Sequence, residues 1–142
     1  MTRINVVPPD ELTDQHLVAE YREIRLLCAN LQRTLNSKHG FVESKVPKQF
    51  TLNGGHVYFF YNKGKYLHNR YNALREEMIT RGMEPQLEFP IDKWPKRLYN
   101  DWVPTKRDMD IVRERIALRI SQRPGWYKYC GQLLEKAGYC QQ

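Results

Sequence analysis

The sequence predicts a single all-α domain of three main helices, with long irregular connections and an extended amino-terminal arm. Apolar residues recur at helical spacings in three segments, and almost no segment alternates apolar and polar residues as a half-buried strand does. The 142 residues suffice for one core and are too few for two. No internal repeat or low-complexity tract divides residues 1–142, so we expect one domain.

The arm and the first helix are the best-marked elements. Consecutive prolines exclude an early helix, so residues 1–9 are expected to run extended. Thr13 can cap a helix that begins at Asp14. Apolar side chains then recur every three or four residues up to Leu35, which predicts one unbroken helix of about six turns.

The middle of the chain holds a loop, a short apolar run and a second helix. Residues 36–48 are polar and interrupted by glycine and proline, as in a loop. The run at 56–61 suits either a short strand or the start of a buried helix, and we favour a buried connector. The second helix is expected from about Gly64 to Arg81, with Gly82 as a left-handed cap.

The last third begins with a crossover and ends with a third helix. Residues 83–104 hold four prolines and several aromatic residues, which predicts a long connection packed by its own aromatics. Thr105 begins a helix that stops before Pro124 and turns apolar residues toward the core at every third or fourth position.

Composition limits the partners and the compartment. Lys plus Arg number 23 against 16 Asp plus Glu, and a net charge of +7 favours nucleic acid or an anionic membrane surface. No stretch approaches the roughly 20 apolar residues of a spanning helix, and no signal peptide is evident, so we expect a cytoplasmic protein without membrane association. Cys28, Cys130 and Cys140 lack paired spacings, so we expect reduced thiols and no metal site.

A row of arginines on the third helix favours nucleic acid over a membrane. Arg115, Arg119 and Arg123 follow at four-residue intervals, so their side chains line one face and can reach successive phosphates. We call these three residues the arginine row. A solvated charged face without a partner is the alternative.

An aromatic tail follows the third helix. Aromatic rings there could stack on bases while an interleaved lysine holds a phosphate, or the rings could close the core. The tail consists of Trp126, Tyr127, Lys128 and Tyr129.

The first helix carries a polar edge that could serve acid–base chemistry. His16, Glu20 and Glu23 lie on this edge, with Arg22 and Arg25 beside it. Partial desolvation would raise the pKa of a border glutamate, whereas neighbouring arginines would lower it. Ordinary ion pairs along the helix are the simpler explanation.

The amino terminus offers a candidate nucleophile. Thr2 is small enough for Met1 to be removed, which would expose an α-amine. The unperturbed pKa of an α-amine is about 7.7 to 8.0, against about 10.4 for lysine, so part of it is uncharged at neutral pH. Most such termini are inert, and this feature alone does not indicate catalysis.

Several strings distributed from Met1 to Gly131 point together to a family. They are MTRIN at 1–5, DQHL at 14–17, AEYRE at 19–23, HV at 56–57, FFY at 59–61, QRP at 122–124 and WYKY at 126–129. They resemble the pyrimidine-dimer DNA glycosylases of the phage endonuclease V type. The resemblance implies a DNA-repair enzyme that excises the 5′ base of an ultraviolet-induced cyclobutane pyrimidine dimer and nicks the strand by β-elimination, as an AP lyase. Its partner would be double-stranded DNA with dimers or abasic sites, and we expect a monomer that needs no metal or organic cofactor.

The resemblance also implies roles for particular residues. The arm would pass between helices and place the Thr2 amine beside Glu23, the amine would form an imine with the damaged sugar, and Glu23 would assist ring opening and proton transfers. Family members kink the duplex and evert the adenine opposite the dimer. The residues expected to contact DNA or line this region are Arg3, Gln15, His16, Tyr21, Arg22, Arg115, Arg119, Trp126, Tyr127, Lys128 and Tyr129.

Two positions depart from the family pattern. The second arginine of the family's first helix falls at Leu26, whereas Arg25 projects about 100° away from that direction. We include Arg25 among the expected DNA-binding residues. Cys130 stands where a second tyrosine is common. A non-catalytic DNA-binding module and a glycosylase for another lesion remain the alternatives.

Overall fold

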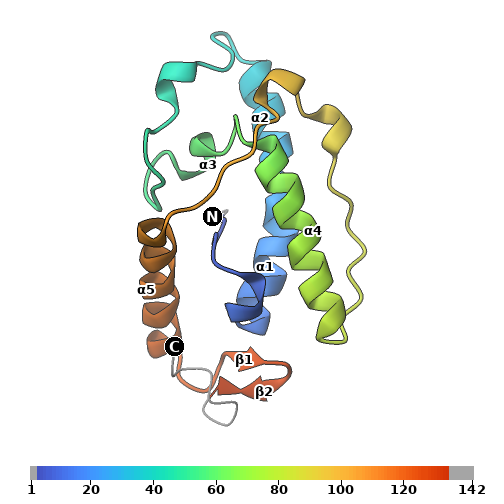
Figure 1. Cartoon of the computed structure of the whole chain (residues 1–142), viewed down its shortest axis with the longest axis vertical. Helices are drawn as coiled ribbons and strands as arrows, with labels where there is room; N and C mark the ends of the chain where they lie inside the picture. The colour runs from blue at the N-terminus through green and yellow to red at the C-terminus, as the bar shows by residue number, and fades with distance from the viewer. Residues whose placement is uncertain (1–2, 135–142) are drawn as a thin grey trace.

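The computed structural model describes residues 3–134 and is mainly helical, as the sequence predicts. α1 packs against α4, and in Figure 1 the amino-terminal arm runs between α5 and the pair formed by α1 and α4. The α-helices are α1 (Asp14–Ile24), α2 (Leu26–Leu35), α3 (His56–Phe59), α4 (Gly64–Thr80) and α5 (Lys106–Gln122). Short 3-10 turns lie at Pro9–Glu11, Glu43–Lys45, Ile91–Lys93 and Lys96–Leu98, and strands β1 and β2 at Lys128–Tyr129 and Gln132–Leu133.

The prediction of one unbroken first helix is wrong at Arg25, where α1 ends and α2 begins. The Arg25 backbone stays right-handed, but the N–H of Cys28 donates to the Arg25 carbonyl oxygen at 3.2 Å, across three residues in place of four. This tighter turn does not reverse the chain, so the buried stripe continues from Ile24 to Leu27 and Leu31. Spacing could not reveal the break because three-residue steps also occur in a regular helix.

The arm belongs to the core, although it is not the regular extended segment that we expected. Ile4, Val6 and Val7 are at most 3% exposed. Val6 has a φ of +49°, in the left-handed region that β-branched residues rarely adopt. The arm is therefore bent at Val6, and tertiary contacts rather than local preference must hold this bend.

The remaining elements follow the sequence closely. Thr13 and Thr105 cap α1 and α5 with their side chains, and Gly82 after α4 has a φ of +85°. The connector at 56–61 begins as the short helix α3. Trp94 of the crossover lies directly on Gly64, where an added Cβ would come within 2.4 Å of the indole ring. A side chain larger than that of glycine does not fit at the first position of α4, because the Trp94 indole packs against this position.

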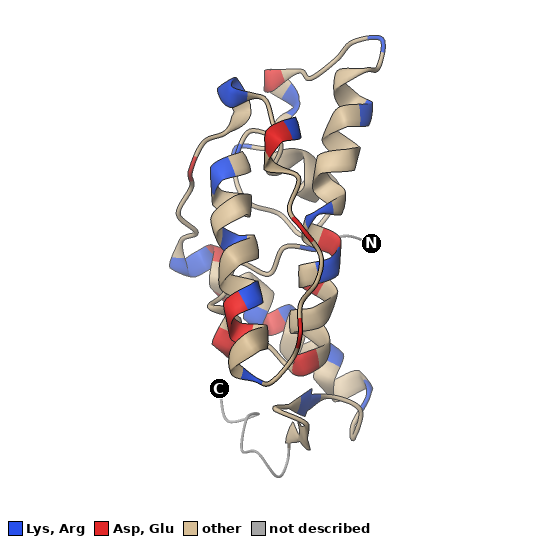
Figure 2. Ribbon diagram, turned by 90° about the vertical axis from the view of Figure 1, so that its right-hand side faces the viewer, with Lys and Arg blue, Asp and Glu red and all other residues tan. Residues whose placement is uncertain are grey.

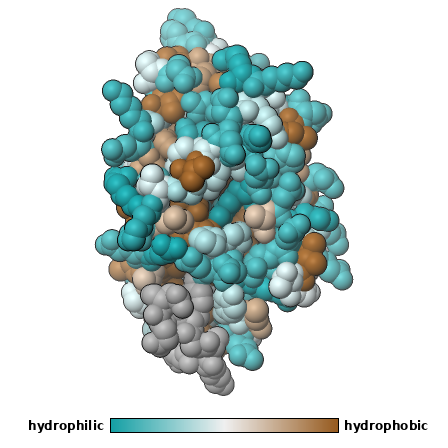
Figure 3. All heavy atoms as spheres, in the orientation of Figure 1, coloured by the Kyte–Doolittle hydropathy of each residue, from teal (hydrophilic) through white to brown (hydrophobic). Residues whose placement is uncertain are grey.

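The structure also describes the cysteine thiols and the hydropathy of the helices and the surface. Cys28 and Cys130 are free thiols, as expected, whereas Cys140 and Thr2 lie outside the described residues. No helix in the described part of the chain could span a membrane. Figure 3 shows mostly hydrophilic atoms on the face seen in Figure 1, with separate apolar spots among the described residues.

Candidate active site and nucleic-acid interface

A pocket of about 370 Å³ lies where the arm, α1, α5 and the aromatic tail meet. Residues predicted for the site come together here from positions more than a hundred apart in the sequence. The pocket is lined by Arg3, Asn5, His16, Ala19, Glu20, Glu23, Arg115, Ile116, Arg119 and Tyr127.

The start of the described arm is fixed by two consecutive backbone hydrogen bonds. The N–H of Arg3 donates to Oε2 of Glu23 at 3.3 Å, and the N–H of Ile4 donates to Nε2 of His56 at 2.9 Å. Thr2 itself lies outside the described residues. The residue that follows Thr2 in the chain is thus hydrogen-bonded to Glu23.

His56 is a supporting residue that sequence reasoning missed as part of the site. Its Nδ1 lies 2.7 Å from the carbonyl oxygen of Thr51, which can only accept, so Nδ1 carries the proton and Nε2 is free to accept from Ile4. The pKa of His56 is lowered to about 4, mainly by burial, against the hydrogen bond to Thr51 and with smaller contributions from the cations of Arg3 and Arg115. The ring is therefore neutral at pH 7 and suited to hold the arm. Its place within an apolar run gave no hint of this contact, because the partner lies 52 residues away.

A buried ion pair supports the arm farther along, at Val7. Glu20 is 1% exposed, and its carboxylate accepts from Nε and Nη2 of Arg70 at 2.7 and 3.0 Å. Arg70, on α4, also donates from Nη1 to the carbonyl oxygen of Val7. A two-pronged guanidinium–carboxylate contact fixes orientation as well as distance. Glu20 and Glu23 lie on one helical edge, but Glu20 is committed to Arg70 whereas Glu23 receives the start of the arm.

The pocket concentrates positive charge. Burial and the nearby Arg115 and Arg119 guanidinium groups lower the pKa of Arg3 from its ordinary value, and Glu23 partly offsets this. Burial, Arg119 and Arg115 also lower the pKa of His16 to about 4, so this imidazole is neutral at pH 7. Several guanidinium groups around one hollow favour a bound polyanion.

The aromatic tail is attached to the beginning of α1. Gln15 donates from Nε2 to the carbonyl oxygen of Trp126 at 2.6 Å and accepts from the N–H of Lys128 at 3.0 Å. The ring of His16 stacks on Tyr127 with centroids 4.8 Å apart and planes 5° apart. Gln15, predicted to contact DNA, thus holds the tail in this structure, and Tyr127 forms part of the pocket wall.

The tail continues into a two-stranded hairpin that the sequence did not reveal. Cys130 and Gly131, between the strands, have φ values of 50° and 81°, as a tight hairpin of the primed type requires. Their N–H groups donate to the two carboxylate oxygens of Asp14 at 2.9 and 2.8 Å. Asp14 also pairs with Arg81 at 2.9 Å, and the Arg81 guanidinium lies 4.2 Å from the centre of the Tyr129 ring. Asp14 therefore links α1, α4 and the hairpin.

Seven predicted DNA-binding residues do not line the pocket, namely Gln15, Tyr21, Arg22, Arg25, Trp126, Lys128 and Tyr129. Tyr21 is buried, and its hydroxyl donates to the carbonyl oxygen of Leu87 and accepts from the Leu87 N–H. Arg22 is exposed on α1, and Arg25 is half-buried at the junction with α2, where its Nε has no hydrogen-bond partner among the described residues. Lys128 is exposed. The structure thus places Tyr21 in the core, Arg22 at the surface and Arg25 between the two.

Trp126 and the last member of the arginine row form a separate pair. The Arg123 guanidinium lies 4.0 Å from the centre of the Trp126 ring, which is 48% exposed. Within the arginine row, Arg115 and Arg119 line the pocket, whereas Arg123 does not. Figure 2 shows that lysine and arginine segments occur along the whole length of the molecule, beyond the pocket itself.

A comparison with known families agrees with this geometry. A family model described as pyrimidine dimer DNA glycosylase matches residues 1–90. The matched part includes the arm, α1, α3 and α4, and therefore Glu23, His56 and the pair of Glu20 with Arg70. In the described part of the chain, no group of three His, Cys, Asp or Glu side chains is arranged to hold a metal ion.

Proposed function

Because the chain belongs to the pyrimidine dimer DNA glycosylase family, we propose that it excises the 5′ base of a cyclobutane dimer and then nicks the strand as a lyase. The observation that carries the proposal is the hydrogen bond from the Arg3 N–H to Glu23. It joins the beginning of the arm to a carboxylate inside a pocket rich in arginine.

The proposed nucleophile is the α-amine of Thr2 after removal of Met1. The amine attacks C1′ of the damaged nucleotide and the glycosidic bond breaks; the base takes the bonding electrons and a proton, and it stays joined to the 3′ pyrimidine through the cyclobutane ring. Opening of the sugar ring then gives an imine between the amine nitrogen and C1′. The imine acidifies the C2′ proton, whose removal expels the 3′ phosphate by β-elimination. Glu23 is proposed to assist ring opening and these proton transfers.

The arginines are proposed to hold the DNA while this chemistry proceeds. Arg3, Arg115 and Arg119 surround the pocket and can contact phosphates on either side of the damaged sugar. A dimer already weakens stacking and pairing, so eversion of a nucleotide costs least at the lesion. Deformation of the duplex is therefore a source of selectivity that requires no contact with the bases themselves.

Borohydride trapping on ultraviolet-irradiated duplex tests the proposal. The processed protein should form a covalent adduct with DNA, because borohydride reduces the imine. Glu23→Gln should still bind the lesion but lose base excision, whereas Glu84→Gln, at an exposed position outside the pocket lining, should behave as wild type. Normal turnover by Glu23→Gln would remove the assigned role.

The same assay ranks the alternatives. Absence of an adduct with processed protein would favour a non-catalytic DNA-binding module. Comparison of dimer-containing, abasic and oxidised duplexes would show which lesion the enzyme prefers. Retention of Met1 should abolish adduct formation, because the nucleophilic amine would be moved by one residue.

A further inference from the structure

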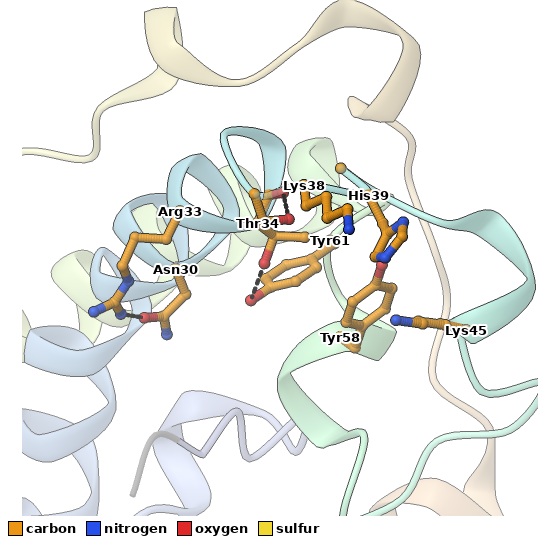
Figure 4. Close-up of a pocket in the computed structure, with 10 residues that line it drawn as sticks. Asn30, Arg33, Thr34, Lys38, His39, Lys45, Tyr58 and Tyr61 are labelled. Atoms are coloured by element: carbon orange, nitrogen blue, oxygen red, sulfur yellow. Dashed lines mark hydrogen bonds between the residues drawn. The ribbon is translucent and has the colours of Figure 1, made fainter.

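A second pocket, of about 500 Å³, lies beyond the candidate active site along α2. Its walls come from the end of α2, the loop after it, the turn at Glu43–Lys45 and the connector that contains α3. Figure 4 shows the side-chain ends of Lys38, His39 and Lys45 gathered around Tyr58, with Arg33 on the far side of Tyr61. Nothing in the proposed chemistry uses these residues.

The pocket is positive and its charges are not compensated. Its lining includes Arg33, Lys38 and Lys45 and no acidic side chain. Arg33 donates to the neutral amide of Asn30, and the described residues offer no hydrogen bond or ion pair to the side chains of Lys38, His39 or Lys45. The carboxyl end of α2 contributes only about half a negative charge. The three cationic side chains therefore carry more positive charge than the end of α2 can neutralise.

Tyr58 packs against neighbouring rings in the pocket and provides a hydrogen-bond donor. The Tyr58 ring stacks on Phe41 at 5.6 Å and contacts Tyr61 at 4.8 Å. Its hydroxyl oxygen accepts from the N–H of Val42 at 2.8 Å, so the hydroxyl proton itself remains available to a ligand oxygen. Tyr61 is buried, and its hydroxyl lies 3.5 Å from that of Thr34. Exposed cations around a tyrosine hydroxyl suit a phosphate group.

We propose that this pocket binds backbone phosphates of the same DNA duplex, outside the lesion; the inference rests on the proposed function. Arg33 follows Glu23 by ten residues, which is on the order of 15 Å along the two successive helices. Phosphates on one strand are spaced by about 3.4 Å of duplex axis, so the pocket lies about four or five base pairs from the reacting sugar. A free phosphorylated small molecule shares this chemistry, and the test separates the two sources.

The test compares two duplexes that carry an uncleavable abasic analogue. One extends about ten base pairs on each side of the lesion and reaches the pocket, and the other extends about three and does not. Lys38→Ala combined with Lys45→Ala should reduce the slope of log K against log salt by about 0.9 per lost phosphate contact, or about 1.8 in total, on the long duplex alone. Lys65→Ala, an exposed change on α4 outside the pocket, is the control and should alter neither duplex.

The outcomes separate failure of this phosphate-binding proposal from failure of the proposed glycosylase and lyase reaction. An unchanged slope on the long duplex, or an equal reduction on both duplexes, would overturn the phosphate contact. Titration with inorganic phosphate and with a nucleoside monophosphate tests whether the pocket binds a free phosphorylated small molecule. If the double substitution abolishes that binding but does not change the salt slope on the long duplex, the pocket binds a free ligand and our proposal is overturned. Binding to an uncleavable duplex needs no amine chemistry, so failure of borohydride trapping would leave these measurements interpretable.

Discussion

Replacement of His56 by glutamine tests how the arm is held. The neutral ring accepts from the Ile4 N–H and donates to the Thr51 carbonyl oxygen. Protonation would place a second donor against the Ile4 N–H, and the charged groups that face the ring, Arg3 and Arg115, are both cations. A protonated His56 should therefore release the beginning of the arm.

The expected magnitude follows from the pKa. Burial lowers the pKa of His56 from 6.5 to about 4, and the side chain is 2% exposed. Each tenfold change in proton affinity is worth about 1.4 kcal/mol, so this difference corresponds to about 3 kcal/mol. Because the folded state binds the proton more weakly than the unfolded state, the stabilisation is fully present above pH 6.5, declines as the pH falls below that value, and is lost below about pH 4.

Urea unfolding between about pH 7.5 and about pH 4 measures this effect. Gln at position 56 can accept from Ile4 and donate to Thr51 but does not titrate, so wild type should lose about 3 kcal/mol more than His56→Gln over this range. His16 also has a lowered pKa, but it is present in both proteins and cancels in the comparison. His39→Gln, at an exposed position, is the control. Parallel stability curves for wild type and His56→Gln, or no acid-induced exchange of the Ile4 amide in wild type, would refute the reasoning.

Three further variants address the DNA contacts, the buried ion pair and the hairpin. Arg115→Ala with Arg119→Ala should weaken binding to all duplexes and reduce the salt slope by about 1.8 in filter-binding titrations; an unchanged slope would exclude these residues from the interface. Arg70→Met should destabilise the fold by about 3 to 5 kcal/mol in urea unfolding, because Glu20 is left buried without its partner, and a loss below about 1 kcal/mol would contradict the importance of the pair. Asp14→Asn should increase hydrogen exchange at the two hairpin-turn amides, since an anionic acceptor is lost, and unchanged protection there would show that the hairpin is held elsewhere.

The sequence by itself determined the helical fold and most of its boundaries. Helix spacing and capping are local properties, so Thr13, Gly82 and Thr105 mark element ends that the structure confirms. The family resemblance also identified most of the residues that line the first pocket. The break at Arg25 and the left-handed bend at Val6 have no such local signal.

Only the tertiary structure decided which of the polar residues serve the pocket and which support it. Glu20 and Glu23 are equivalent by helical position, but Arg70, fifty residues away, pairs with Glu20 alone. Gln15 is drawn to the tail across 111 residues, and Tyr21 is turned into the core. Periodicity fixes the face of a helix on which a residue lies, whereas its hydrogen-bond partner depends on which distant segment packs against that face.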